Sequence, residues 1–584
     1  MKRNKGITLV ALVITVIILL ILAGVAISMI TGGEGLFARA NKAAGEYNNS
    51  AIAEEEAYSQ MIDILAYQDG TKYSANAPKL TTGMKAVIFN TDGTTREPAN
   101  NEEWYNYKNK QWANAETEDG SLWVWIPRFA YKITYYTDGS KNTIQGTRDV
   151  EGYKKADGTT ITSIGTDEEV NTVNNEIKSI YGSIDIVFLQ DQGNQYYKEV
   201  DGKIILANAV DDGYIIHPAF KDGRGNYDNG EWRAELTGFW IAKFEAGFQQ
   251  GNAVNTSEND TTNVQRSSVS YSSPHAQIRE NLVTTWNTAR NYIDGIYSKN
   301  TSGDLEDITG YEMLRDVKIS YPVFKGANYV MNYICIQDAY KLCRAMAEDG
   351  NMYGLSSSKV DTHLIKNSEY GACAYLSYSQ YGAEGKEPYI NNLTLNDDEK
   401  SVYTVTGFAG KSQNASGVTS IQDVNIWYTP EGQKGSSNYN ITGVYDMSGC
   451  AWQYTSAIIN NNSESIMKYG QVFLDEIGEG KSTEYITIYN HVTLEGMTHV
   501  EATRANFNVN LDVYGDAVAE TSVDGYSTVK SWDGTTSLFL ADQYQFSSRG
   551  NSYNGATKSG IFSYTRGIGR AFWADSFRAV IVNI

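Results

Sequence analysis

Proline, cysteine and positive charge are all scarce in this sequence. Its 584 residues include 8 prolines and 4 cysteines, and 48 Lys and Arg against 69 Asp and Glu give a formal net charge of −21. Such an excess of negative charge repels phosphate backbones, so we expect no nucleic acid partner. Repeats at periods of about 20–50 residues are also missing from the sequence, which argues against solenoids and propellers.

The four cysteines, Cys335, Cys343, Cys373 and Cys450, form no CxxC pair and no cluster with histidine. The sequence therefore predicts no zinc site. Cys335 and Cys343 are eight residues apart, about 12 Å along a predicted helix, so they cannot bridge to each other. We expect small buried thiols, and a disulfide to a distant partner stays open because sequence cannot pair these residues.

Motifs of several enzyme classes are missing as well. The sequence contains no phosphate-binding GxxxxGK[ST], no Rossmann fingerprint and no HExxH,. Five histidines are present, and none stands beside a serine or cysteine nucleophile motif. His217 and His363 are expected to be loop or strand-end residues whose ring nitrogens are satisfied by backbone groups.

Tyrosine, tryptophan and glycine, by contrast, are abundant, with 42, 11 and 53 residues. Asn, Ser and Thr fill the intervals between short apolar runs, a composition typical of β-rich and loop-rich chains. Apolar spacing predicts helices over residues 336–348 and 366–381, and an aromatic strand over 120–133 whose expected partner is 238–247. The sequence therefore predicts an α+β fold, built as several units or as one elaborated domain.

The first thirty residues combine basic and apolar segments. Lys2, Arg3 and Lys5 precede an uncharged apolar run over residues 7–30. As a helix this run would extend roughly 36 Å, enough for a hydrocarbon core of about 30 Å, and the basic flank places the N-terminus in the cytoplasm. We therefore predict a single-pass transmembrane helix with the bulk of the chain extracellular. The alternative is a secretory signal peptide, whose apolar stretch is shorter, about 7–15 residues.

The junction KGITL at residues 5–9 resembles the leader of type IV pilins and pseudopilins. The resemblance implies that a prepilin peptidase cuts after Gly6, which makes Ile7 the new N-terminus. Pilins usually carry a glutamate at the fifth mature position, where it helps subunits pair, and this chain has Ala11 there. Apolar residues at spacings of three and four predict that the helix continues to about Tyr67. Such a helix is similar to that of pilins, and this resemblance implies that its upper half packs on a globular head. The alternative is a plain membrane anchor with a helical stalk.

We predict four segments along the chain. They are a leader peptide (1–6), a membrane-spanning pilin-like helix and stalk (7–68), a small β segment or linker (69–118), and a head (119–584) with large insertions near 140–235 and 250–320.

Several motifs of the predicted head follow one another in the order of a known family. GSLWVWIPRFAYKI, GFWIAKFEAG, GVYDMSGCAWQY and RGNSYN with a terminal SFR together resemble the formylglycine-generating-enzyme (sulfatase-modifying factor) family. The nearest point is GVYDMSGCAWQY, which is similar to the family's GLYDMSGNVWEW. The resemblance covers about residues 120–584 and implies a variant of the C-type-lectin-like fold.

This resemblance does not carry the family's activity with it. True formylglycine generators use a cysteine pair near the C-terminus to bind copper and oxidise a substrate cysteine, and no cysteine follows Cys450 here. Some members bind calcium through an asparagine and a glutamate of GNVWEW, and these places hold Cys450 and Gln453,. We therefore predict a non-enzyme without catalytic residues, metal ligands or cofactor, with calcium left open at an altered site.

Aromatic and small polar residues alternate between Arg549 and Arg578. In C-type-lectin-like folds this stretch lines a ligand-facing surface, and aromatic residues with arginine are enriched at binding surfaces. Core packing is the equally weighted alternative, because aromatic residues in a terminal β-hairpin pair across strands. The candidate ligand-binding residues are Asn551, Tyr553, Asn554, Thr557, Phe562, Tyr564, Ile568, Arg570, Phe572, Trp573 and Asp575.

Two functional hypotheses follow from these patterns. The first is a membrane-anchored, surface-displayed bacterial binding or adhesion protein, whose non-catalytic lectin-like head recognises an extracellular protein or glycan. The ending of the chain also resembles targets of diversity-generating retroelements. The alternative is a minor pilin or pseudopilin, a structural subunit of a type IV pilus or secretion filament. The expected partners are the membrane, prepilin peptidase, other pilus or pseudopilus subunits and the unknown ligand.

Overall fold

The computed structural model confirms that helices and sheets occur together, as an α+β fold requires. The residues that the structure describes are 9–28, 57–58, 61, 64–65, 75–136, 144–146, 148–149, 152–154, 160–161, 181–248, 297–299, 305–307, 322–326, 330–331, 334–391, 403–404, 406–407, 427–461, 463–478, 480–492, 496, 498–553, 555, 558–570 and 574–584. The chain divides into two compact units. The first comprises Met1–Lys72 with Lys198–Ile205, and the second comprises Tyr73–Tyr197 with Leu206–Ile584.

The N-terminal helix α1 covers Leu9–Ser28. A helix that crosses a bilayer must be both long enough and apolar enough, and no helix in the described part of the chain meets this requirement. This finding overturns the predicted transmembrane helix and the predicted single-pass localisation in the cell membrane. The long N-terminal helix to about Tyr67 is not shown either, and Gly6 and Ile7 lie outside the described residues.

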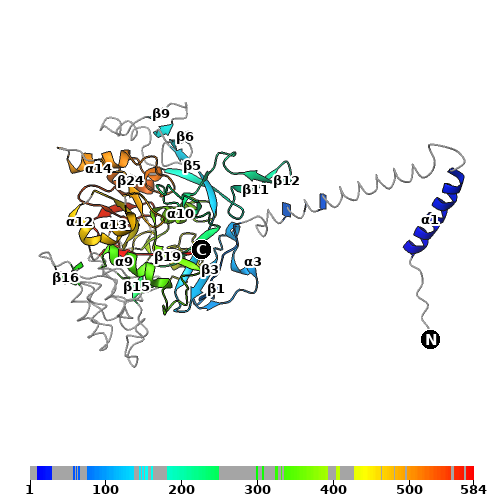
Figure 1. Cartoon of the computed structure of the whole chain (residues 1–584), viewed down its shortest axis with the longest axis horizontal. Helices are drawn as coiled ribbons and strands as arrows, with labels where there is room; N and C mark the ends of the chain where they lie inside the picture. The colour runs from blue at the N-terminus through cyan, green and yellow to red at the C-terminus, as the bar shows by residue number, and fades with distance from the viewer. Residues whose placement is uncertain are drawn as a thin grey trace, which may run out of the picture. The chain divides into compact units, whose positions relative to one another are not determined.

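The second unit contains a seven-stranded sheet with the order β19-β29-β14-β4-β3-β1-β2. The predicted pairing of residues 120–133 with 238–247 is confirmed, since Trp125 of β4 lies opposite Trp240 of β14. All neighbours in this sheet are antiparallel, and the C-terminal strand β29 lies between β19 and β14. The C-terminus accordingly lies next to β19 in Figure 1. The strands are β1 (Met84–Phe89), β2 (Thr95–Arg96), β3 (Asn114–Thr117), β4 (Leu122–Pro127), β14 (Gly238–Ala242), β19 (Val360–Leu364) and β29 (Ala579–Asn583).

The strand predicted over residues 120–133 is divided in two, since β4 ends at Pro127 and the chain continues into a second sheet. There β5 pairs antiparallel with β10 on one side and with β13 on the other, while β6 also pairs with β5. Most of this sheet comes from the stretch that the sequence marks as an insertion. Its strands are β5 (Phe129–Tyr136), β6 (Ile144–Gly146), β10 (Tyr181–Phe188) and β13 (Ile215–Ile216).

The C-terminal third forms another seven-stranded sheet, with the order β23-β22-β26-β27-β25-β24 and with β28 paired to β22. This sheet is mixed, because β22 runs antiparallel to β26 but parallel to β23 and β28. Its strands are β22 (Trp452–Ile459), β23 (Thr487–Tyr489), β24 (Tyr526–Ser531), β25 (Thr535–Leu538), β26 (Phe546–Arg549), β27 (Tyr564–Gly567) and β28 (Asp575–Phe577).

Two central helices match the helices predicted from apolar spacing. α9 covers Ile336–Arg344 and α10 covers Asn367–Tyr378. The N-terminus of α10 is fixed by Glu369, whose carboxylate accepts the backbone N–H of Lys366 at 2.9 Å,. Every residue of α10 is buried, and the helix packs against β10 and β22. It therefore lies within the core rather than on the surface.

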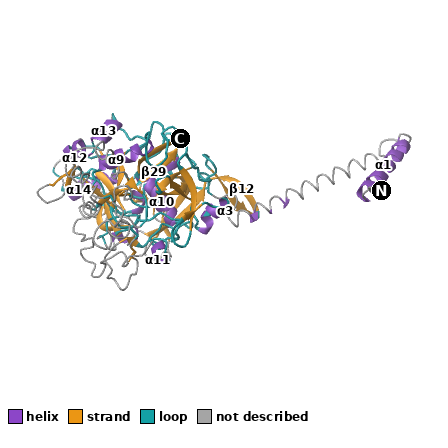
Figure 2. Ribbon diagram, turned by 90° about the horizontal axis from the view of Figure 1, so that it is seen from below, coloured by secondary structure: helices purple, strands orange, loops and turns teal. Residues whose placement is uncertain are grey.

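Figure 2 shows α9, α12 and α13 together on one side of the second unit and α3 on the opposite side. The remaining elements of the chain are short. They are α3 (Asn101–Trp104), η1 (Tyr107–Asn109), β7 (Arg148–Asp149), β8 (Gly152–Lys154), β9 (Thr160–Ile161), β11 (Gln195–Val200), β12 (Lys203–Asn208), η2 (Pro218–Phe220), β15 (Gly247–Phe248), β16 (Tyr297–Lys299), β17 (Leu305–Asp307), β18 (Pro322–Val323), η4 (Ala345–Ala347), β20 (Ile390–Asn391), β21 (Tyr403–Thr404), α11 (Pro430–Gln433), α12 (Glu464–Tyr469), α13 (Gln471–Ile477), α14 (His499–Asn508), η6 (Ala519–Thr521) and η7 (Trp532–Gly534).

One continuous apolar cluster joins the two seven-stranded sheets and α10. It contains Trp125 and Ile581 from the first sheet, Tyr454 and Phe546 from the C-terminal sheet, and Leu376 from α10. All four cysteines are buried and in the thiol form, as expected for small apolar side chains,. This shared core supports the C-terminal sheet, which carries the candidate site.

Candidate functional site

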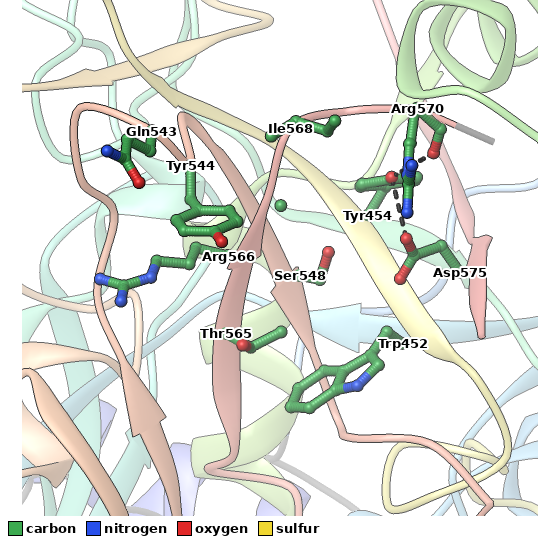
Figure 3. A pocket seen from close by; sticks show the side chains of 11 residues that line it. Trp452, Tyr454, Gln543, Tyr544, Ser548, Thr565, Arg566, Ile568, Arg570 and Asp575 are labelled. Carbon is green, nitrogen blue, oxygen red and sulfur yellow. Dashed lines mark hydrogen bonds between the residues drawn. The ribbon is translucent and has the colours of Figure 1, made fainter. Parts of the chain in front are cut away.

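A pocket of about 530 Å³ opens on the C-terminal sheet, between β22, β26, β27 and the segment that leads into β28 (Figure 3). Its walls combine aromatic rings, hydroxyl and amide groups, two arginines and one carboxylate. The lining residues are Trp452, Tyr454, Gln543, Tyr544, Ser548, Thr565, Arg566, Gly567, Ile568, Arg570 and Asp575.

Strand register explains why residues so far apart in the sequence meet here. Tyr454 lies opposite Ser548, Ser548 lies opposite Thr565, and Trp452 lies opposite Asp575. Residues directly opposite each other share one face of a sheet, and so do residues two apart on a strand. These five side chains therefore belong to the same face, which forms the floor and one wall of the pocket.

At one end of the pocket, the hydroxyl of Tyr454 lies between two acceptors. Its oxygen is 2.9 Å from the carbonyl oxygen of Arg570 and 3.0 Å from Oδ2 of Asp575. Burial raises the pKa of the Asp575 carboxyl to about 7, and the hydrogen bond from Tyr454 and the charge of Arg570 offset only part of this effect,. The Asp575 carboxyl therefore changes its charge near neutral pH.

The opposite wall is formed by Tyr544 and Arg566, whose side chains lie along each other (Figure 3). The Arg566 guanidinium lies 5.3 Å from the ring centroids of both Tyr526 and Tyr544. It donates hydrogen bonds to Thr503 Oγ1 and to the carbonyl of Phe539, each at 2.6 Å. Burial lowers its pKa to about 10, so it remains charged at neutral pH, and no carboxylate of the described residues forms an ion pair with it.

The sequence-predicted ligand residues fall into three groups. Ile568, Arg570 and Asp575 line the pocket. Asn551 and Tyr553 are almost fully buried, with 6% and 7% of their surface exposed, and do not line it. Phe562 and Tyr564 are also buried and do not line it. The third group lies outside the described residues and consists of Asn554, Thr557, Phe572 and Trp573.

Phe562 and Tyr564 belong to the protein interior, as the core-packing alternative expected. Phe562 is fully buried against Tyr378 and Trp532, with ring centroids 5.1 Å from each. Tyr564 is 1% exposed, and its hydroxyl lies 2.8 Å from Oγ of Ser522. Alternation along a strand does not indicate which face is covered by other parts of the fold. Here the side chains of Phe562 and Tyr564 are covered.

Sequence reasoning missed most of the pocket. The predicted site did not include Trp452 and Tyr454 of the motif GVYDMSGCAWQY, although their spacing of two places them on one face of a strand,. Tyr544 and Arg566 carry no local signal, since their proximity arises from the pairing of β26 with β27. The other lining residues outside the prediction are Gln543, Ser548, Thr565 and Gly567.

The two positions that correspond to calcium ligands in the resembled family face protein groups in the core. Gln453 donates a hydrogen bond to Oε1 of Glu245 at 3.1 Å and accepts one from Nε of Arg578 at 2.9 Å. Cys450 is fully buried, and burial raises the pKa of its thiol. Within the described ranges, no group of three or more His, Cys, Asp or Glu residues is placed to hold a metal ion.

Comparisons with known proteins give no relative. No protein-family model matches the sequence, and a search of the curated proteins found no match. The chemistry of the pocket must therefore be inferred from its own side chains. They include two arginines, one carboxylate and several neutral polar groups.

Proposed function

We propose that the chain is a non-catalytic binding or adhesion protein, and that the pocket on its C-terminal sheet is the ligand-binding site. One observation carries this proposal: a pocket of about 530 Å³ presents aromatic rings together with arginine, carboxylate and hydroxyl groups. Ligand sites are concave and combine apolar rings with a few polar groups that fix orientation. The ligand is a protein or a glycan, as the sequence predicts.

The pocket is built on paired strands, which supports a binding role. Trp452, Tyr454, Ser548 and Thr565 are all strand residues whose positions are fixed by ladder hydrogen bonds. Ser548 and Tyr454 are almost fully buried, whereas Tyr544 keeps 38% of its surface exposed. A rigid floor with an accessible aromatic rim lowers the entropy lost on binding.

We further propose that the second unit is a variant of the C-type-lectin-like fold, with the formylglycine-generating-enzyme-like order of motifs. Support comes from the places of three motifs that carry the resemblance. GSLWVWIPRFAYKI and GFWIAKFEAG supply the paired strands β4 and β14, and the terminal SFR leads into β29 next to β14. The pilin-like leader stays a proposal based on the sequence alone.

Binding screens with purified protein test the proposal. The full chain is applied to glycan and protein arrays, and retained ligands are measured by isothermal titration calorimetry. Trp452→Ala should weaken binding by about tenfold or more, because it removes a stacking surface at the pocket. Gln543→Ala, at the exposed rim, should weaken ligand binding less. This second variant still tests the pocket if Trp452→Ala does not fold.

The control is Met467→Ala, which changes an exposed side chain on α12 outside the pocket. Equal loss of affinity in the control and in Trp452→Ala would place binding elsewhere. Retention of no ligand at all would argue against the binding function and in favour of a structural filament subunit.

A further inference from the structure

We propose that the pocket binds a ligand whose carboxylate is attached to a ring, and that Asp575 takes up a proton when this ligand binds. The inference rests on the proposed function and specifies the chemistry of its ligand. Four features of the pocket support it. They are the hydroxyl contacts of Tyr454, the charged groups of the lining, the exposed aromatic rings and the register of Trp452 with Asp575.

The contacts of Tyr454 leave room for an extra proton on Asp575. A tyrosine hydroxyl has one hydrogen and can donate it to one acceptor only. The carbonyl of Arg570 at 2.9 Å and Oδ2 of Asp575 at 3.0 Å are both acceptors when the carboxyl is ionised. Both contacts become hydrogen bonds if Asp575 is protonated, because the carboxyl then donates to Tyr454 and Tyr454 donates to Arg570. The raised pKa of Asp575, about 7, is consistent with this arrangement.

Protonation of Asp575 removes the charge of the carboxylate that lines the pocket, whereas Arg570 and Arg566 of the same lining keep theirs. Arginine is well suited to recognise carboxylates. The charged and titratable groups around Asp575 are Tyr454 with Cys335 behind it, Arg570, and across the pocket Tyr544 and Arg566 with His499.

The exposed rings determine where the ligand lies. Trp452 is partly exposed and lies directly opposite Asp575 in the strand register. A flat ring stacked on Trp452 would therefore lie on the same face of the sheet as Asp575, and Figure 3 shows Asp575 between Trp452 and Arg570,. Ser548 and Thr565, side by side on β26 and β27, offer hydroxyls to the polar edge of such a ring.

Charge and proton are coupled in this arrangement. The ligand carboxylate is repelled by an ionised Asp575, and this repulsion is removed when Asp575 is protonated. Ligand binding therefore raises the proton affinity of Asp575, and by linkage a higher pH must weaken ligand binding. The ring can belong to an acidic sugar or to an aromatic acid, and both share the carboxylate that is recognised here.

Calorimetry with matched probes tests this inference on the full chain. The probes are glucuronate with its neutral parent glucose, and 4-hydroxybenzoate with its neutral isostere 4-hydroxybenzamide. We expect one acid to bind about tenfold or more tightly than its neutral partner, since a charge-assisted hydrogen bond is involved. Which acid binds identifies the source of the ring.

The pH dependence provides the second readout. Between about pH 6 and about pH 8.5 the affinity for the acid should fall about tenfold, which corresponds to a shift of one pKa unit on binding. Titrations in two buffers of different ionisation enthalpy should show net proton uptake. Asp575→Asn should keep the affinity seen at low pH and lose the pH dependence, whereas Arg570→Gln should weaken binding of the acid but not of the neutral probe.

Four results would overturn the inference, and three of them concern probes that bind. They are neutral probes that bind as tightly as the acids, an affinity that rises with pH, and an unchanged pH slope in Asp575→Asn. Absence of binding by all four probes would also overturn it. The proposed function is judged separately, since it fails only if no ligand from the array screen depends on Trp452.

Discussion

Nε2 of His363 lies 2.9 Å from Oε1 of Glu369, and Nδ1 of the same ring lies 2.8 Å from Oδ1 of Asp361. The imidazole is completely buried. A neutral imidazole has one N–H, so only the imidazolium donates to both carboxylates. Burial alone would lower the pKa of His363, but the two carboxylates outweigh this effect and raise it. The core of the protein thus contains a charged histidine between two acids.

We predict that His363→Gln lowers the free energy of unfolding by about 2–3 kcal/mol, because it removes the cation that both buried carboxylates share. Among the cations of the described residues, Asp361 then keeps only Arg344 at 2.6 Å, and Glu369 keeps only Lys366 at 3.8 Å. Since the folded pKa is raised, the stabilisation by His363 is fully present below the unfolded value near 6.5 and is lost as pH rises through the folded pKa. Urea unfolding of both proteins across this range measures the effect, and the difference should shrink on the alkaline side.

The matched control is His491→Gln, whose partner Asp542 has 45% of its side chain exposed, in contrast to the buried partners of His363. Exposed ion pairs contribute little, so we expect a change below about 1 kcal/mol. A similar loss in both variants, or a difference for His363→Gln that grows with pH, would refute the assignment of a buried imidazolium.

Asp575 offers a second pH prediction, which concerns stability without any ligand. Its folded pKa of about 7 lies above its ordinary value of 3.8, so the folded state gains stability from this group at low pH and loses it as pH rises from about 4 through 7. Asp575→Asn should therefore stabilise the protein by about 1–3 kcal/mol at pH 8 and have little effect at pH 4. Thermal unfolding at both pH values measures this, and a destabilised variant at pH 8 would contradict the protonated arrangement with Tyr454.

Local patterns in the sequence were sufficient for individual elements. Paired aromatic runs predicted the contact of β4 with β14, and spacings of three and four predicted α9 and α10. His217 caps a short helix by accepting the N–H of Ala219 at 3.3 Å, as expected for a histidine satisfied by the backbone. For α9, α10 and His217 the decisive contacts are made by residues within or next to the motif, whereas β4 and β14 are distant in the sequence but share the same aromatic pattern.

Other contacts between distant segments could not be predicted from local sequence patterns. His363 was expected to pair with backbone groups, yet its partners are carboxylates brought close by β19 and α10. Asp575 meets Trp452 through a parallel strand pairing across more than a hundred residues. For the same reason only Ile568, Arg570 and Asp575 of the predicted ligand residues line the pocket. Periodicity gives the faces of a strand, but only the complete fold decides which face is covered.

Gly371 allows α10 to approach the loop that precedes η6. A Cβ atom at this position would lie 2.1 Å from the carbonyl oxygen of Gly515, which is backbone and cannot rotate away. We predict that Gly371→Ala destabilises the protein by about 1–3 kcal/mol, although alanine favours helices, because overpacking outweighs propensity. Gly567→Ala is the control, since its nearest atom would lie 3.8 Å away. A stabilised Gly371→Ala variant in urea unfolding would show that this contact is looser.

Arg578 connects the C-terminal strands to the rest of the core with three separate donors. Its guanidinium bonds to Oε1 of Gln453 at 2.9 Å and to the carbonyls of Ala242 at 2.6 Å and Tyr445 at 2.7 Å, and the side chain is fully buried. A lysine ammonium keeps the charge but cannot reach three acceptors arranged around a planar fork.

We therefore predict that Arg578→Lys lowers the free energy of unfolding by about 2–4 kcal/mol, since buried acceptors lose their donors. Arg224→Lys is the matched control, because this side chain is 71% exposed and pairs only locally with Asp222, and it should change stability by less than about 0.5 kcal/mol. Chemical denaturation of the two variants measures the difference. If Arg578→Lys is as mild as its control, then the charge rather than the geometry of the guanidinium holds β29 in place.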